Sequence, residues 1–296
     1  MVNSPGKKNL CNSSLPLLQL ALPMYDIFYS LKQKPFSVTS NPSFLFLSRR
    51  HKEALAHLFY GIKERVGFIE ITGEVGTGKT TICRALLNQL DEKIKTAFIF
   101  NSNVSEMQLM QTIVEDLGIQ VNKKSKSKGA LFSELNQFLI EQLTRGNNVV
   151  LIIDEAQNLS LKLLEQVRML SNLESENEKL LQIVLVGQPE LRDKLNLPAL
   201  RQLRQRIAVR YHIEALDRSE VPLYISHRLA LAGANGSAPV FEQDALDEIY
   251  HYSGGIPRLI NMLCNKTLLT GFVLEKRHID EEIVKQSILE LEGAPA

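Results

Sequence analysis

One octapeptide restricts the fold of this chain more than any other stretch. Residues 73–80 read GEVGTGKT, which fits the pattern G-x-x-x-x-G-K-[ST]. Glycines at this spacing allow a tight loop whose backbone N–H groups point inward around phosphate oxygens. The run before it, GFIEIT (67–72), has the composition of a strand, and KTTICRALLNQL (79–90) carries its apolar residues on one helical face. The motif therefore predicts a phosphate-binding loop between a strand and a helix.

Strand-like and helix-like stretches alternate as far as residue 213. After the first strand, further strands are expected at 96–101, 148–154, 180–187 and 207–213, with helices at about 105–117, 130–144 and 160–173. Apolar strands separated by such helices predict an α/β fold with a parallel five-stranded sheet covered on both faces. Beyond residue 214 the strand pattern stops. Four helices are expected there, at about 218–232, 242–252, 256–270 and 279–291.

Composition excludes several classes of protein. The formal net charge is +1, so a nucleic-acid role would have to rest on a local basic patch. The three cysteines lie far apart, match no zinc spacing and indicate a reducing, cytoplasmic setting. No apolar run approaches the roughly 18 residues that a membrane-spanning helix needs.

The first 23 residues stand apart from the rest of the chain. Lys7 and Lys8 precede LPLLQLALP (15–23), which is weakly similar to a signal peptide. Gln19 interrupts this run, no small-residue cleavage site follows, and the next segment begins naturally at Met24. We therefore expect residues 1–23 to be a disordered extension or the product of a misplaced start codon.

The glycine-rich loop predicts how a nucleotide would be held. Lys79 would reach the β and γ phosphates, and the Thr80 hydroxyl would bind Mg²⁺. The helix that follows adds the positive end of its dipole. The residues expected to bind the nucleotide are Gly73, Glu74, Val75, Gly76, Thr77, Gly78, Lys79, Thr80 and Thr81.

The second half of such a site is a buried strand that ends in acidic residues. VVLIIDEAQ (149–157) fits this description. Asp154, at the end of the strand, can hold the magnesium shell, and Glu155 can orient and polarise an attacking water. In isolation these could be two solvated acids, but the phosphate loop favours the functional interpretation. A nucleotide and Mg²⁺ are therefore the expected ligands, and Glu155 favours hydrolysis.

Six stretches together resemble one group of ATPases. They are GEVGTGKTT, IIDEAQNL, SNLES, LLQIVLVGQPEL, LRQLRQRI and GGIPRLINMLC. They are similar to the ExeA/GspA group of AAA+ ATPases, which serve type II secretion, and to MshM-type proteins, which serve a type IV pilus. The resemblance runs from about residue 24 to 290, and it implies that the nucleotide is ATP. DNA-transposition ATPases of the TniB type share the core but fewer of these stretches.

The resemblance implies a division of the chain into domains. Residues 24–213 would form an AAA+ P-loop NTPase domain, residues 214–292 an all-helical lid domain and residues 293–296 a tail. Longer members of the group continue into a membrane span and a periplasmic domain. Since this chain stops at Ala296 with neither, we expect the short type or a paralogue that works with a separate membrane partner.

The resemblance also assigns roles to single residues. Gln188, just after the fourth strand, occupies the place of the sensor that contacts the γ-phosphate and water, where many AAA+ proteins have Asn or Thr. Arg258, in GGIPR, resembles the second sensor, an arginine that reaches back to the nucleotide. The stretch PSFLFLSRRHKEAL (42–55) would pass close to the adenine.

Four arginines lie within ALRQLRQRIAVR (199–210). Arg201 and Arg204 would share a helix face, whereas Arg210 would lie on the strand beyond and pair locally, so the four would not form one patch. This disfavours a nucleic-acid footprint, which needs several charges on a common surface. In AAA+ proteins this segment carries the arginine finger for the neighbouring subunit's ATP, and the resemblance makes Arg204 and Arg206 the candidates, with Arg201 behind. A solvated charged face is the alternative.

The favoured hypothesis is an ATPase located in the cytoplasm, either free there or bound peripherally at the inner membrane. It would form a homo-oligomer with ATP at the subunit interfaces and energise a type II secretion or type IV pilus-like system through an inner-membrane partner. The alternative is a DNA-associated regulator or transposition helper of the TniB type. A third hypothesis is a nucleotide switch that binds ATP and barely turns over, against which Glu155 argues.

Overall fold

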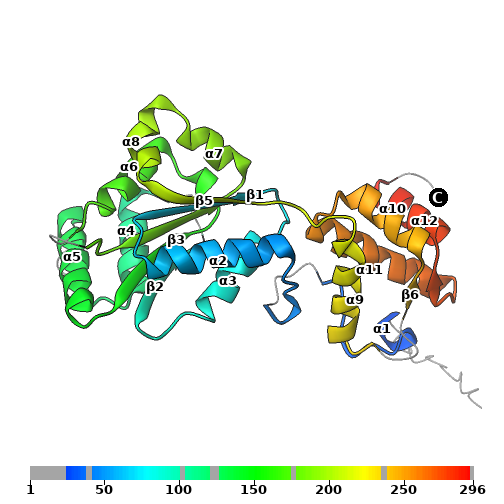
Figure 1. The fold of residues 1–296 in the computed structure, drawn as a ribbon. Coiled ribbons are helices and arrows are strands. Elements are labelled where there is room, and N and C mark those ends of the chain that lie inside the picture. The colour runs from blue at the N-terminus through cyan, green and yellow to red at the C-terminus, as the bar shows by residue number, and fades with distance from the viewer. Residues whose placement is uncertain are drawn as a thin grey trace, which may run out of the picture.

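The computed structural model describes residues 25–37, 42–100, 104–120, 127–174, 178–234 and 239–293. The expected extension at 1–23 and most of the expected tail lie outside the described residues. Figure 1 shows two units side by side, an α/β unit and a C-terminal helical unit, joined by the chain that leaves the last strand of the sheet.

The α/β unit is built on the predicted parallel five-stranded sheet. Its strands are β1 (Phe68–Gly73), β2 (Ile94–Ile99), β3 (Asn148–Ile153), β4 (Gln182–Gly187) and β5 (Ile207–Ile213), in the order β2-β3-β4-β1-β5. Every residue of β1 and of β4 is buried, as expected for inner strands of a sheet covered on both faces. The predicted fold class is confirmed.

Helices cover both faces of the sheet. On one face, α2 (Arg49–Lys63) and α3 (Lys79–Leu87) pack over Ile69, Val150 and Val186. On the other face, the strand residues that alternate with these pack under α4, α5 and α6. The bounds of these and the following helices are α4 (Glu106–Asp116), α5 (Lys128–Thr144), α6 (Leu161–Leu170), α7 (Pro189–Leu195) and α8 (Arg201–Gln205), with short 3-10 turns η2 (Ala156–Asn158) and η3 (Pro198–Leu200).

The C-terminal unit contains the four expected helices and one element that was not expected. The helices are α9 (Glu220–Leu231), α10 (Gln243–Ser253), α11 (Pro257–Val273) and α12 (Glu281–Leu291). Two strands of two residues each, β6 (Val240–Phe241) and β7 (His278–Ile279), pair in parallel beside them. The unit is therefore not all-helical, as had been expected. The two strands were not predicted because a two-residue strand is too short to show a period in the sequence.

The N-terminal segment belongs to the core of the C-terminal unit. It forms α1 (Tyr25–Phe28) and the 3-10 turn η1 (Pro42–Phe44), and Figure 1 shows α1 beside the C-terminal helices. Tyr29 and Phe36 are fully buried in that core, and the ring centroids of Phe28 and Phe272 lie 5.5 Å apart. Residues 24–213 were expected to form the α/β domain, but residues 25–37 pack into the C-terminal unit instead.

Within the described residues, no helix combines the length and the apolar character that crossing a bilayer requires.

Candidate nucleotide-binding site

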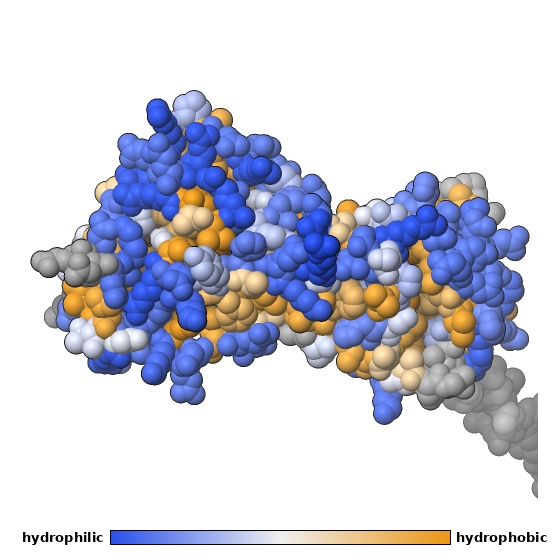
Figure 2. Space-filling view, in the orientation of Figure 1, coloured by the Kyte–Doolittle hydropathy of each residue, from blue (hydrophilic) through white to orange (hydrophobic). Residues whose placement is uncertain are grey.

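A cavity of about 380 Å³ lies where the two units meet. Figure 2 shows a narrow waist at this junction, with hydrophilic residues over much of its upper part. Its lining comes from the phosphate loop and the start of α3, from the helices α9 and α11, and from Ser37, residues 44–46, His51, Glu155 and Gln188. A volume of this size is typical of small-molecule sites, which are often found between domains.

The predicted phosphate loop has a backbone geometry that requires glycine at two positions. Gly76 and Gly78 have φ angles of 86° and 96°, values that residues with a Cβ rarely adopt. A Cβ on Gly76 would also lie 2.6 Å from the Cβ of Arg258. The loop ends in α3, whose first residues are Lys79 and Thr80, so the positive end of a helix dipole faces the cavity.

Lys79 is held against the loop itself. Its Nζ donates to the carbonyl oxygens of Gly73 and Glu74, at 2.7 and 2.9 Å. Burial lowers the pKa of Lys79, and the nearby carboxylates of Glu155 and Asp154 oppose this shift. A buried ammonium group in this position can neutralise phosphate charge.

Asp154 and Thr80 form the part of the site that fits a magnesium ion. The Thr80 Oγ1 donates to Asp154 Oδ2 at 2.6 Å, and the Glu155 N–H donates to Asp154 Oδ1 at 2.9 Å. Asp154 is only 2% exposed, and burial raises its pKa. A buried carboxylate beside a hydroxyl supplies the oxygen ligands that Mg²⁺ takes together with substrate phosphates, and the cation would offset the cost of burying the charge.

Glu155 is held by two glutamine side chains. It has a φ of 51°, which turns the chain sharply after β3. Its Oε2 accepts from Gln157 Nε2 at 2.6 Å and from Gln188 Nε2 at 3.2 Å. Gln157 Oε1 in turn accepts from the backbone N–H of Gln188 at 3.1 Å. Thus Glu155 and Gln188 meet where β3 and β4 end, and Gln157 connects them.

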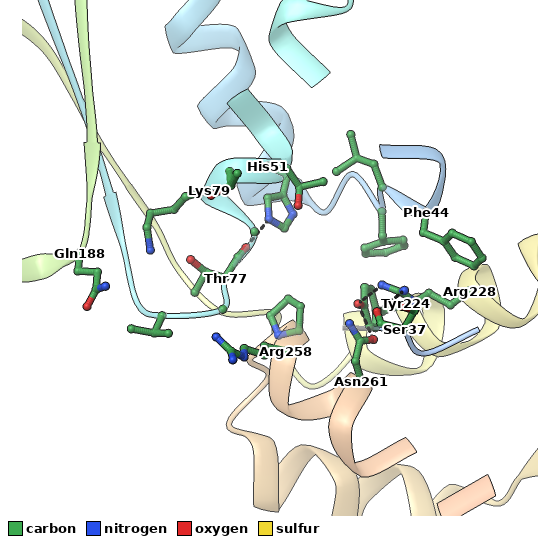
Figure 3. A pocket seen from close by; sticks show the side chains of 18 of the residues that line it. Ser37, Phe44, His51, Thr77, Lys79, Gln188, Tyr224, Arg228, Arg258 and Asn261 are labelled. Carbon is green, nitrogen blue, oxygen red and sulfur yellow. Dashed lines mark hydrogen bonds between the residues drawn. The ribbon is translucent and has the colours of Figure 1, made fainter. Parts of the chain in front are cut away.

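Arg258 approaches the loop from the C-terminal unit. It lies at the second position of α11, after Pro257, and its backbone N–H donates to the Gly76 oxygen at 3.3 Å. In Figure 3 its side chain extends toward the phosphate loop, on the same side of the cavity as Lys79 and Gln188. Arg258 therefore lies at the phosphate loop, in the position predicted for a residue that reaches the nucleotide from the second unit.

The other end of the cavity is built around a buried arginine. Arg228 is 7% exposed and donates to the oxygens of Pro35 and Tyr224, at 2.6 and 2.9 Å. Its guanidinium carbon lies 4.9 Å from the ring centre of Phe44, a cation–π contact. Figure 3 shows Tyr224, Arg228 and Asn261 grouped below Phe44. This aromatic and apolar end suits a nucleotide base.

Sequence reasoning missed several residues of the cavity wall and of the adjoining hydrogen-bond network. Arg228 and Asn261 carry no local signal, because only the packing of α9 against α11 brings them together. Two others had a signal. Gln157 is part of the run IIDEAQNL, and His51 follows the helix-capping Ser48 by three residues.

The arginines at 201–206 lie away from this cavity. Arg204 donates to Asn196 Oδ1 at 3.3 Å, and Arg206 donates to Ser171 Oγ at 2.7 Å. Neither belongs to the described residues that line the cavity, and the same holds for Arg201. Arg210 pairs with the buried Glu70 at 3.1 Å, which confirms the predicted local pairing.

Comparison with known proteins agrees with the predicted resemblance to AAA+ ATPases. The family model described as "AAA domain" matches residues 62–195. General secretion pathway protein A of Aeromonas hydrophila is 42% identical over 270 residues, which are 91% of this chain and 49% of that protein. The chain thus spans about half the length of that relative.

Solved structures share the fold at low sequence identity. The ORC2 protein of Aeropyrum pernix, solved in ADPNP-ADP complexes, has a TM-score of 0.62 and 18% identity, covering 88% of this chain and 72% of that one. The RuvB Holliday junction branch migration motor of Thermotoga maritima has a TM-score of 0.53 and 17% identity, covering 81% and 68%. At these identities the similarity concerns the fold alone. The sequence matches, and not these structures, show that this chain belongs to the family of AAA-domain proteins that includes general secretion pathway protein A.

Proposed function

We propose that this protein binds ATP with Mg²⁺ in the cavity between its two units and hydrolyses it. The observation that carries this proposal is the convergence of Lys79, Asp154 and Glu155 at the end of the sheet, next to the glycine-rich loop. A site of this kind supplies positioning and electrostatic stabilisation, which are the main contributions to phosphoryl transfer.

Each group then has a role. Lys79 and the loop amides bind the phosphates, and Arg258 adds a second positive charge from the C-terminal unit. Thr80 and Asp154 hold Mg²⁺, which neutralises charge on the transferred phosphoryl group when bound. The Glu155 carboxylate orients water and accepts its proton, while Gln188 contacts both that carboxylate and the region of the γ-phosphate.

The working form is a homo-oligomer. β5 runs parallel to β1, and its last residue, Ile213, pairs with Gly73 at the start of the phosphate loop. Arg204 and Arg206 precede the first residue of β5, and seven residues of strand span about 20 Å. These arginines are therefore too far from the ATP site of their own chain, and a second copy is needed for either to act as an arginine finger.

We place this ATPase on the cytoplasmic side of the inner membrane, where it energises assembly of a type II secretion or type IV pilus-like system. The 42% identity to general secretion pathway protein A supports the secretion role. The ion pair of Arg210 with the buried Glu70 disfavours the DNA-associated alternative, because this charge is offset within the chain.

The test is ATP turnover in matched variants. Wild-type protein should release phosphate from ATP, and removal of Mg²⁺ by a chelator should stop the reaction. Lys79→Ala should weaken ATP binding by at least about a hundredfold, since it removes a charge-assisted contact to the phosphates. Lys63→Ala changes an exposed lysine at the far end of α2 and should leave binding unchanged. Equal affinity of Lys79→Ala and wild type would reject the site.

A further inference from the structure

A hydrogen-bonded relay connects the start of α2 to the phosphate loop. The Oγ of Ser48 lies 2.8 Å from His51 Nδ1, and His51 Nε2 lies 2.8 Å from the carbonyl oxygen of Thr77. Figure 3 shows the His51 ring directed at this loop residue. His51 is only 4% exposed. None of the roles assigned above uses this buried imidazole.

The partners of the ring determine which nitrogen carries hydrogen. A carbonyl oxygen can only accept a hydrogen bond, so His51 Nε2 must donate to Thr77. Burial lowers the pKa of His51, which favours the neutral ring, and Nδ1 then accepts from the Ser48 hydroxyl. Ser48 also caps α2 by accepting from the His51 N–H at 3.2 Å. The ring is thus fixed at both nitrogens.

This contact controls the direction of a loop amide. The bond between Thr77 and Gly78 is trans, because the described residues contain no cis peptide. In a planar trans peptide the C=O and the following N–H point in opposite directions. Because His51 holds the Thr77 oxygen toward α2, the Gly78 N–H points away from α2 and into the loop, where phosphate oxygens bind.

The geometry around Gly78 leaves little freedom for another arrangement. A Cβ on Gly78 would lie 3.2 Å from His51 Nε2, so the imidazole packs directly on the backbone that it orients. The start of α2 is also tied to the C-terminal unit. The Arg49 N–H donates to Glu220 Oε1 at 2.9 Å, and Arg50 pairs with Glu214 at 2.5 Å. His51 therefore projects from an anchored helix start.

We propose that His51 is a positioning residue for nucleotide binding, which acts through the Thr77 carbonyl to aim the Gly78 N–H at the phosphates. The inference rests on the nucleotide-binding function proposed above. If His51 acts in this way, nucleotide affinity depends on a hydrogen-bond donor at the Nε2 position and not on the imidazole ring itself.

Two amide substitutions separate the donor from the ring. The side-chain nitrogen of glutamine lies as many bonds from Cβ as His Nε2 does, so His51→Gln can still reach the Thr77 oxygen. The nitrogen of asparagine corresponds to Nδ1 instead, so His51→Asn keeps a polar amide but cannot reach. The measurements are the Kd for ATP and for ADP, the KM and kcat for ATP, and the melting temperature without nucleotide.

For His51→Gln we expect the Kd and KM to stay within about threefold of wild type, and for His51→Asn we expect both to rise about tenfold, with kcat at saturating ATP unchanged. A purely structural role would lower the melting temperature of both variants without this difference in Kd. Equal Kd values for the two variants, whether wild-type or weakened, would overturn the proposal. Failure of the wild type to bind ATP would instead reject the proposed function.

Ser48→Ala provides the second variant if His51→Asn does not fold. It keeps the ring and removes the hydroxyl that orients it, so the Kd for ATP should rise by more than the roughly threefold range expected for His51→Gln. Wild-type affinity in Ser48→Ala would then count against the relay.

Discussion

The side-chain amide of Gln157 donates to the carboxylate of Glu155, two residues earlier in the chain, at 2.6 Å. The other end of that amide accepts from the backbone N–H of Gln188 at 3.1 Å. Gln157 thus sets the position of the Glu155 carboxylate relative to the end of β4. An oriented carboxylate is what a general base requires, since proton transfer depends first on geometry.

Substitution of Gln157 should therefore affect turnover more than binding. In Gln157→Leu, Glu155 loses its 2.6 Å hydrogen bond to the Gln157 amide, and we expect kcat to fall about tenfold or more while the Kd for ATP changes less than about threefold. Steady-state kinetics and ATP titration measure the two quantities. Gln137→Leu, on the exposed surface of α5, is the matched control. A rise in Kd with unchanged kcat would show that Gln157 serves binding instead.

Mixing of inactive variants should restore activity if an arginine acts across the subunit interface. Arg204→Ala or Arg206→Ala should lose most of the turnover at concentrations where the protein is oligomeric, because each precedes β5 and cannot reach its own site. Added Glu155→Gln subunits, which keep both arginines, should restore part of that turnover. Because Arg206 also donates to Ser171, Ser171→Ala controls for loss of that contact. Full activity of both arginine variants would reject the finger assignment.

The pair of Arg210 and Glu70 should stabilise the fold in a pH-dependent manner. Burial raises the pKa of Glu70, and Arg210 opposes this shift. In Arg210→Met the pKa of Glu70 should rise further. The loss of stability relative to wild type should therefore be largest at pH values above that pKa, where Glu70 is charged. It should disappear as pH falls below the ordinary value of 4.5, where Glu70 is protonated in both proteins. We expect a loss of about 1–2 kcal/mol at pH 7, because half-exposure of Arg210 weakens the pair.

Urea unfolding at about pH 7 and pH 4 measures this difference. Arg201→Met, at an exposed arginine of α8, should leave stability unchanged at both pH values. Restoration of stability at pH 7 in the double variant Arg210→Met, Glu70→Gln would confirm that an uncompensated buried charge is the cause. An equal loss at both pH values would contradict it.

The sheet and the phosphate loop could be predicted because their signals are local. Strands β3 and β5 were predicted to within one residue. β3 is a continuous apolar run bounded by polar residues, and β5 has apolar or aromatic residues at every second position. The predicted residues Thr80 and Asp154 meet at 2.6 Å, because the loop and the end of β3 must lie at the same edge of a parallel sheet.

Long-range packing could not be predicted in the same way. Tyr29 donates to the carbonyl oxygen of Lys276, which is 247 residues away, and nothing in the sequence around Tyr29 indicates that partner. The contact of His51 with the Thr77 carbonyl likewise depends on where the start of α2 lies relative to the phosphate loop. The packing of α2 against the sheet sets this position. Arg204 and Arg206 were predicted for a partner subunit, and a single chain shows only that they lie away from their own site.

The most direct test of the account is the identity of the nucleotide that Glu155→Gln retains. The variant keeps Lys79, Thr80 and Asp154, and it loses the carboxylate that orients water, so it should bind Mg²⁺-ATP with about wild-type affinity and hold it intact. After incubation with labelled ATP and removal of free nucleotide, the bound label should be ATP in the variant and ADP in the wild type. ADP in both proteins, formed at the same rate, would contradict the assignment of Glu155 as the residue that activates water.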